Sequence, residues 1–168
     1  TGMKEAQIDL TDNLGRVVHT IPLSGNGVDY TITTLPNQQN FDAVTTPALP
    51  QGWAKLVVGT ASGDVNTYTS TTAGIVYSAP NVARITNSTD VTGSYILYAP
   101  PVQNTNQNRV KFFARGGAAN VPVIVGYSNN PNDPDNFVGI TTITLTATHT
   151  EYIVSLGNVP NGNYRVAF

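Results

Sequence analysis

The stretch RVKFFARGGAANVPVIVGY, residues 109–127, decides the fold class of the chain. Its apolar residues recur at every second position: Val110, Phe112 and Ala114, then Val121, Val123, Val125 and Tyr127. Successive side chains of a β-strand point to opposite faces, so this spacing predicts two strands, each with one buried face. Pro122 has no N–H to donate, which predicts that the second strand starts at a sheet edge or a bulge.

The same alternation recurs along the rest of the chain. It is present in ITLTATH (residues 143–149), EYIVSL (151–156) and NYRVAF (163–168). GSYILYAP (93–100) is apolar at nearly every position, which predicts a strand buried on both faces that ends at Pro100-Pro101. Asn, Gly and Pro residues separate these runs and predict turns. We therefore expect an all-β, antiparallel sandwich with almost no helix.

Composition excludes several classes of function. The 168 residues contain no cysteine, so disulfides, cysteine-bound zinc and thiol nucleophiles are absent. Only 11% of the residues are charged and the formal net charge is −2, which gives no basic surface for nucleic acid. No apolar stretch approaches the roughly 20 residues of a membrane-spanning helix, so we expect no membrane insertion. The chain shows no signal-peptide pattern, but an exported precursor could have lost one.

The first 36 residues have a pattern of their own. QIDLTDNLGRVVHTIPL (residues 7–23) predicts a hairpin that turns at residues 13–15. Asn26-Gly27 predicts a second turn, followed by a third strand in DYTITTL (29–35). PNQQNF (36–41) is polar and begins with proline, so we place the junction there. The expected organisation is a β piece at 1–36 and a sandwich module at 37–168.

A series of motifs in the second part resembles a known type of module. NFDAVTTPALPQGWAK (residues 40–55) combines an acidic and aromatic start with a Pro-x-Gly-Trp element. SAPNVARI (78–85), RVKFFARGG (109–117) and YRVAF (164–168) follow in order. This series resembles the MAM-like, cleaved-adhesin or "choice-of-anchor J" jelly-roll modules of secreted Bacteroidota proteins. The resemblance covers roughly residues 37–168 and implies a jelly-roll β-sandwich that is secreted or at the cell surface.

The chain departs from such modules in two places. They normally continue past the equivalent of YRVAF into one more strand, often with paired acidic residues, whereas this chain stops at Phe168. Residues 1–36 have no counterpart and look more like the last strands of an immunoglobulin-like or fibronectin-like domain. Because a free strand edge favours pairing, a strand of this piece could instead complete the sandwich. Both alternatives stay open.

Two segments are candidates for metal binding. In YSNNPNDPDNF (residues 127–137), Asp133 and Asp135 could supply oxygens to calcium, but Asn, Pro and Asp are also the residues that a long hairpin connection requires. The pattern of an EF-hand is absent, which favours the turn. Asp42 is a candidate by resemblance, since such modules often hold a structural calcium ion near their acidic start. Structural Ca²⁺ is thus the one cofactor that the resemblance implies.

Catalysis and sugar binding are the other two site hypotheses. A hydrolytic triad needs a histidine beside a serine, yet the only histidines are His19 and His149, and no Gly-x-Ser-x-Gly elbow occurs. We therefore expect no enzyme. Sugar rings stack on aromatic side chains while polar groups bind their hydroxyls. The expected ligand-binding residues are Tyr68, Tyr77, Asn66 and Arg115.

The function expected from the sequence is that of a non-catalytic accessory module of an exported bacterial protein. It would bind carbohydrate or mediate surface adhesion, with a polysaccharide or a surface protein as its partner. The alternative is a structural spacer or assembly module that acts through its sheet edges and binds no small ligand. Fold alone does not decide between them.

Overall fold

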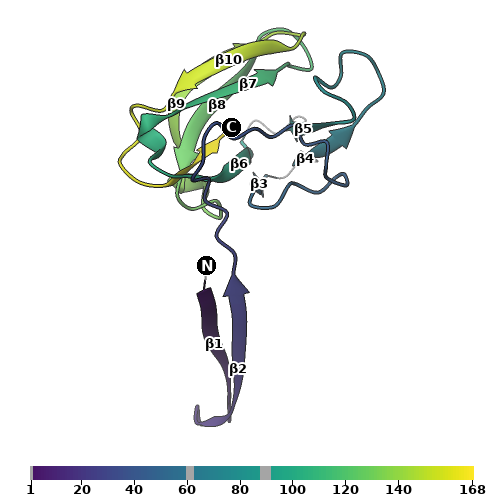
Figure 1. Ribbon diagram of the computed structural model, residues 1–168. Coiled ribbons are helices and arrows are strands. Elements are labelled where there is room, and N and C mark those ends of the chain that lie inside the picture. The colour runs from purple at the N-terminus through teal and green to yellow at the C-terminus, as the bar shows by residue number, and fades with distance from the viewer. Residues whose placement is uncertain (1, 60–62, 88–91) are drawn as a thin grey trace. The chain divides into compact units, whose positions relative to one another are not determined.

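The computed structural model describes residues 2–59, 63–87 and 92–168 (Figure 1). The chain divides into two compact units, Thr1–Tyr30 and Thr31–Phe168. Both are built from antiparallel strand pairs, so the all-β prediction is confirmed. Within the described residues, no helix has the length and apolar character needed to cross a membrane.

The first unit is a single hairpin of β1 (Gly2–Thr11) and β2 (Val17–Gly27). The turn lies where the sequence predicted it, because the carboxylate of Asp12 accepts hydrogen bonds from the N–H groups of Leu14 (2.9 Å) and Arg16 (3.0 Å). Gly15 adopts φ 77°, the left-handed conformation that glycine tolerates. These local bonds fix the register of the hairpin.

The second turn and third strand predicted for this region are wrong. Asn26 and Gly27 continue β2 opposite Met3 and Gly2, because β1 is long enough to pair with them. Residues 28–35 then form no strand, only a single parallel bridge from Ile32 to Val102. Whether residues 1–36 are the tail of a neighbouring domain or complete the sandwich stays a prediction.

The second unit contains three described sheets. The largest has the order β3 (Ala54–Val58), β6 (Ser94–Val102), β11 (Tyr164–Ala167), β8 (Val121–Ser128) and β9 (Val138–Leu145). Two further sheets pair β4 (Asp64–Thr69) with β5 (Asn81–Thr86), and β7 (Arg109–Ala114) with β10 (Thr150–Ser155) (Figure 1). All ladders between these strands are antiparallel.

The core of the second unit lies between two layers of strands. Val154 and Leu156 come from β10 and the residue that follows it, and they pack against Val125 of β8 and Val166 of β11. Phe112 of β7 joins them from the same side as β10. Burying such side chains contributes roughly 2 kcal/mol each to folding. The arrangement is consistent with a β-sandwich.

The strand predictions for this unit are largely confirmed. Residues of β7 alternate between exposed and half-buried, as the period of two requires. Pro122 pairs only with β9, because β11 reaches β8 no earlier than Gly126, and the β8–β9 register shifts between Val125 and Gly126. β6 is buried on both faces as expected.

The predicted end of β6 at Pro100-Pro101 is wrong. The strand continues to Val102. Proline lacks an N–H, but its carbonyl still accepts, and Pro101 O accepts from Ile32 N over 2.7 Å. The neighbouring Gln103 N donates to Ile32 O over 2.9 Å, so both sides of this bridge are satisfied.

Candidate functional site

An exposed group of rings lies where the loop after β4 meets β7. The ring of Tyr77 stacks on that of Phe113, with centroids 4.0 Å apart and an interplanar angle of 10°. His149, one residue before β10, lies 5.7 Å from the Tyr77 ring. Tyr77 is 57% exposed and Phe113 is 38% exposed. We refer to these three residues as the aromatic platform.

Arg115 anchors the loop that carries Tyr77. Its Nη1 donates to the carbonyl of Gly74 over 2.7 Å, and its Nε donates to Gly116 O over 3.2 Å. Because Arg115 directly follows β7, these bonds tie the loop to the strand that presents Phe113. The Tyr77 ring is therefore held in place rather than left free to rotate away.

The charge of the platform depends on its histidine. Burial lowers the pKa of His149, and the nearby positive charge of Arg115 lowers it further. His149 is therefore neutral at pH 7, and Arg115 supplies the positive charge at this place. Beside them, Lys111 Nζ and a Glu151 carboxylate oxygen form an ion pair of 3.0 Å.

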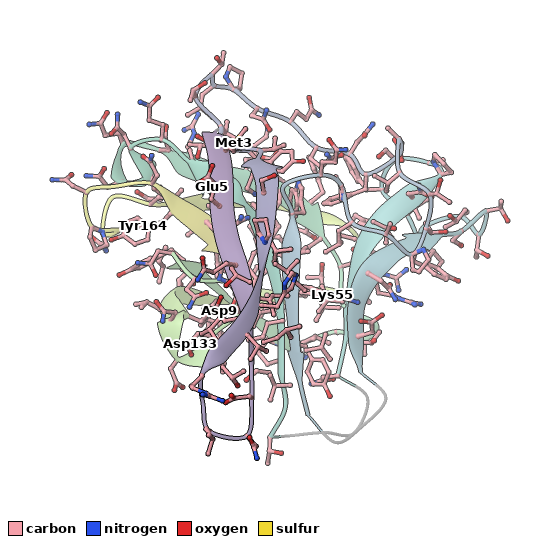
Figure 2. All side chains as sticks on the ribbon, turned by 90° about the horizontal axis from the view of Figure 1, so that it is seen from below. Met3, Glu5, Asp9, Lys55, Asp133 and Tyr164 are labelled. Atoms are coloured by element: carbon pink, nitrogen blue, oxygen red, sulfur yellow. The ribbon has the colours of Figure 1, made fainter. Side chains whose placement is uncertain are left out.

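A second group of polar side chains lies on one face of the β4–β5 pair. Asn66 Nδ2 donates to Asp64 over 2.9 Å, and the same carboxylate accepts from Lys55 of β3. Figure 2 labels Lys55. The Lys55 hydrogen bond is the main reason that the pKa of Asp64 is lowered. The guanidinium carbon of Arg84 lies 4.3 Å from the centre of the Tyr68 ring, a cation–π contact.

The predicted ligand-binding residues thus fall into two groups. Tyr77 and Arg115 meet at the aromatic platform, whereas Tyr68 and Asn66 share the β4–β5 face. Sequence reasoning missed Phe113, although an aromatic side chain at an outward position of an alternating strand signals an exposed ring.

Asp42 serves as a structural acceptor. Its Oδ1 accepts from Asn81 N over 3.1 Å, at the start of β5. Asn81 is only 5% exposed, and its side-chain amide donates to the carbonyls of Phe41 (3.1 Å), Asp42 (3.5 Å) and Val44 (2.9 Å). Thr69 Oγ1 in turn donates to Asn81 Oδ1 over 2.7 Å. We call this arrangement the Asn81 knot.

The Asn81 knot bears on the predicted metal site. Three carbonyl oxygens and a carboxylate are a ligand set that suits calcium, but here the N–H groups of Asn81 occupy them. Within residues 2–59, 63–87 and 92–168, no group of three or more His, Cys, Asp or Glu side chains could hold a metal ion. Asp42 as a calcium ligand stays a prediction.

The loop at residues 127–137 forms a connection stabilised by its own side chains. Asp133 (Figure 2) accepts from Asp135 N over 3.0 Å and from Asn136 Nδ2 over 2.8 Å, and Pro134–Asn136 form a 3₁₀ turn. Asn130 Oδ1 accepts from Asn132 N over 3.1 Å. These bonds confirm the turn that Asn, Asp and Pro predict here.

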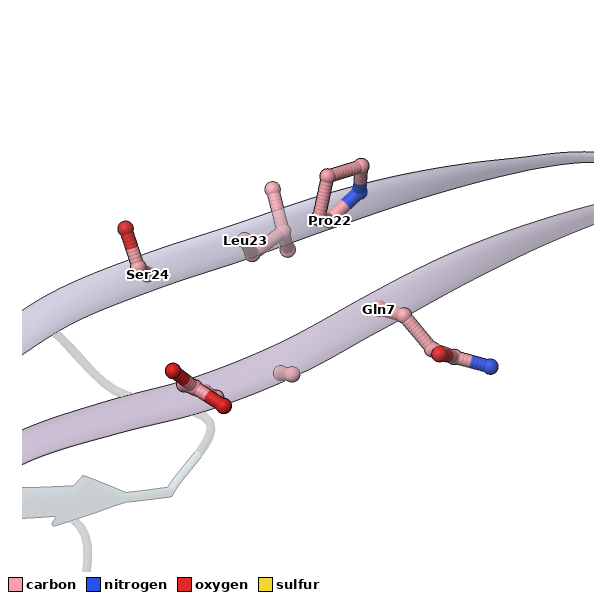
Figure 3. A pocket seen from close by; sticks show the side chains of 6 residues that line it. Gln7, Pro22, Leu23 and Ser24 are labelled. Atoms are coloured by element: carbon pink, nitrogen blue, oxygen red, sulfur yellow. The ribbon is translucent and has the colours of Figure 1, made fainter.

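A shallow depression on the hairpin is not a comparable site. It is lined by Glu5, Ala6, Gln7, Pro22, Leu23 and Ser24 (Figure 3). Ala6 and Leu23 are paired across the two strands and share one face, while their neighbours along each strand point to the other face. Polar and apolar groups therefore do not converge on one point.

No family model, no curated protein and no solved structure matches this chain. Of the two groups, the aromatic platform offers the larger exposed ring surface.

Proposed function

We propose that this chain is a non-catalytic accessory module of an exported, secreted or cell-surface bacterial protein. Its second unit is a jelly-roll β-sandwich that binds carbohydrate or mediates surface adhesion through the aromatic platform. The support for the jelly-roll topology and for export is the resemblance of residues 37–168 to adhesin modules. The support for binding is the geometry of Tyr77.

One observation carries the binding proposal: Tyr77 is stacked on Phe113 and still more than half exposed. Phe113 covers one face of the ring and leaves the other face for a ligand. The apolar C–H face of a sugar stacks on such a ring, and little conformational entropy is lost because the ring is already fixed. Arg115, which binds the Tyr77 loop at Gly74 and whose charge acts on His149, would offer a guanidinium to a hydroxyl or carboxylate of the same ligand.

The β4–β5 face supports binding less strongly. Arg84 already covers the Tyr68 ring at 4.3 Å, and only 37% of Tyr68 is exposed. A sugar would have to displace this cation–π contact before it could stack on that face. We therefore assign Tyr77 and Arg115 the primary role, and Tyr68 and Asn66 a secondary one.

A glycan array probed with the full chain tests the proposal. Tyr77→Ala is expected to lower the signal at least tenfold, while Tyr77→Phe, which keeps the ring, retains most of it. Tyr30→Ala is the matched control, because Tyr30 is also an exposed tyrosine but belongs to the first unit. Silence across neutral and acidic polysaccharides, or equal signals from Tyr77→Ala and Tyr30→Ala, would refute sugar binding.

The second candidate function is a structural spacer or assembly module that acts through its sheet edges. The observation that favours it is that β3 and β9 are the outer strands of the five-stranded sheet. Exposed strand edges pair readily with other chains. Sedimentation at increasing protein concentration tests it, because a module that assembles through such edges forms larger species without any glycan.

A further inference from the structure

A groove with a volume of about 720 Å³ lies between two of the described sheets. Residues 83, 85 and 87 on the β5 side line it, together with all of β7. Of the described residues that line it, none belongs to β4 or β10, the partners of β5 and β7. The groove therefore borders the sides of β5 and β7 on which, among the described residues, neither strand pairs with another. We call it the strand groove.

The backbone of β7 offers hydrogen bonds toward the side away from β10. Leu156 N donates to Asn108 O over 3.0 Å, just beyond the β7–β10 ladder. Hydrogen-bonded positions alternate along antiparallel strands, so every second residue after Asn108 bonds to β10. The N–H and C=O groups of Arg109, Lys111 and Phe113 therefore point the other way. Within the described part of the chain, β7 pairs with no strand on that side.

The five-stranded sheet and the segment before the Pro-x-Gly-Trp element contribute mostly apolar side chains to the groove. Ile96 of β6 and Val166 of β11 line it from the five-stranded sheet. The segment before the Pro-x-Gly-Trp element contributes Leu35 and Phe41, and it forms no ladder in the described structure. Protein cores are normally packed at crystal density, so an apolar groove of this size beside a free strand edge has room for another backbone.

The charges of the residues that line the strand groove restrict which ligands it can bind. Arg109, Lys111 and Arg115 line the strand groove, and no Asp or Glu occurs among the described lining residues. Arg109 and Lys111 are exposed on the outward face of β7, where Lys111 already pairs with Glu151 of β10. A residue directly opposite Arg109 or Lys111 on a newly paired strand would be most stable as an acid.

We propose that the strand groove receives an extended segment of a partner protein, which pairs with β7. The segment has apolar residues at alternate positions facing the groove and acidic residues between them facing Arg109 and Lys111. The six residues of β7 set its paired length at about 20 Å. This is recognition by strand addition, and it goes beyond the sugar-binding proposal because it uses a groove and a backbone edge rather than the free face of Tyr77.

Fluorescence anisotropy with labelled eight-residue peptides tests the groove. The probe Ser-Val-Glu-Val-Glu-Val-Glu-Ser is expected to bind the full chain at least tenfold more tightly than a peptide of the same composition with its valines and glutamates in separate blocks. Lys111→Glu is expected to weaken binding about tenfold, and added salt should also weaken it. Equal affinity for both peptides would overturn the proposal.

Two variants test whether the peptide binds in the strand groove or elsewhere on the surface. Ala83→Trp fills the groove from β5 and is expected to abolish peptide binding, whereas Ala6→Trp, the same change in the first unit, leaves it intact. Tyr77→Ala should leave peptide binding unchanged while it removes glycan binding, so the two proposals fail independently. Peptide binding that survives Ala83→Trp in a folded variant would place the peptide elsewhere and refute the groove.

Hydrogen exchange supplies the direct readout of strand addition. The amides of Lys111 and Phe113 are expected to exchange at least tenfold more slowly once the peptide is bound, because their N–H groups then donate to it. Unchanged exchange under saturating peptide would contradict pairing with β7. Slow exchange of the same amides without peptide, together with a dimer in sedimentation, would mean that a second copy fills the groove, which also overturns the partner proposal.

Discussion

Both units are built from strands with alternating apolar residues, but they bury very different fractions of those side chains. In the hairpin, Ile8, Leu10, Ile21 and Leu23 lie on one face and are all exposed. In the second unit, the alternating residues of β8 and β10 meet across two layers, and Val125 and Val154 are buried. Alternation therefore specifies a strand, but burial needs a second layer that two strands cannot supply. The hairpin on its own has no core.

The largest expected loss of stability tests this contrast between the two units directly. Leu156→Ala removes a side chain that is 1% exposed and should lower the free energy of unfolding by about 3 kcal/mol. Leu10→Ala, the same change on a residue that is 47% exposed, should cost less than about 0.5 kcal/mol. Urea denaturation of the full chain measures both. Equal losses would show that the hairpin face is covered in solution.

The next effect concerns polar burial in the second unit. Asn81→Ala leaves the carbonyls of Phe41 and Val44 without their donor and should destabilise the chain by about 2 kcal/mol. Asn129→Ala, on an exposed loop position, is the matched control and should change little. Thermal melting compares them. A melting temperature unchanged by Asn81→Ala would mean that the knot contributes nothing.

A smaller effect is expected from pH. Burial lowers the pKa of His149 below its unfolded value near 6.5, so the unfolded chain binds the proton more readily. Stability contributed by the neutral ring is present above pH 6.5 and is lost as pH falls through the lower folded pKa. His149→Asn should flatten the fall in melting temperature between pH 7 and 5. An identical fall in both proteins would exclude His149 as its source.

The smallest expected effect is that of a chelator. Because Asn81 already donates to the oxygens around Asp42, we expect EDTA to leave the melting temperature unchanged and added Ca²⁺ not to raise it. A rise in melting temperature with Ca²⁺ that is lost in Asp42→Asn would instead establish the metal site that the resemblance implies.

Local patterns in the sequence were enough to predict the hairpin turn, the alternation of β7 and the double burial of β6. They gave wrong predictions where the local structure depends on residues that are distant in the sequence. Asn26-Gly27 is a strong turn signal, yet it continues β2 because β1 extends far enough to pair with it. Likewise, Pro101 remains within β6 because Arg165 of β11 pairs with it and Ile32 donates to its carbonyl, and both residues are far away in the chain.

The candidate site was also predicted only in part, because its contacts join residues that are distant in the sequence. Tyr77 and Arg115 could be named from their residue types, but not brought together, since their loop and strand meet through contacts between residues that are distant in the sequence, Arg115 with Gly74 and Tyr77 with Phe113. The Asn81 knot joins residues about 40 positions apart and has no local signature. Phe113 could have been predicted from its outward position on an alternating strand.

The bridge at Ile32 has a mechanical consequence. Its two hydrogen bonds attach the chain to the end of β6 inside the five-stranded sheet, ahead of every strand of that sheet in chain order. Tension applied through the N-terminal residues would load these two bonds before it reached any other pairing of that sheet. In a module that carries tension between two bodies, these two bonds would break before the other pairings of the five-stranded sheet, while its folded layers stayed intact.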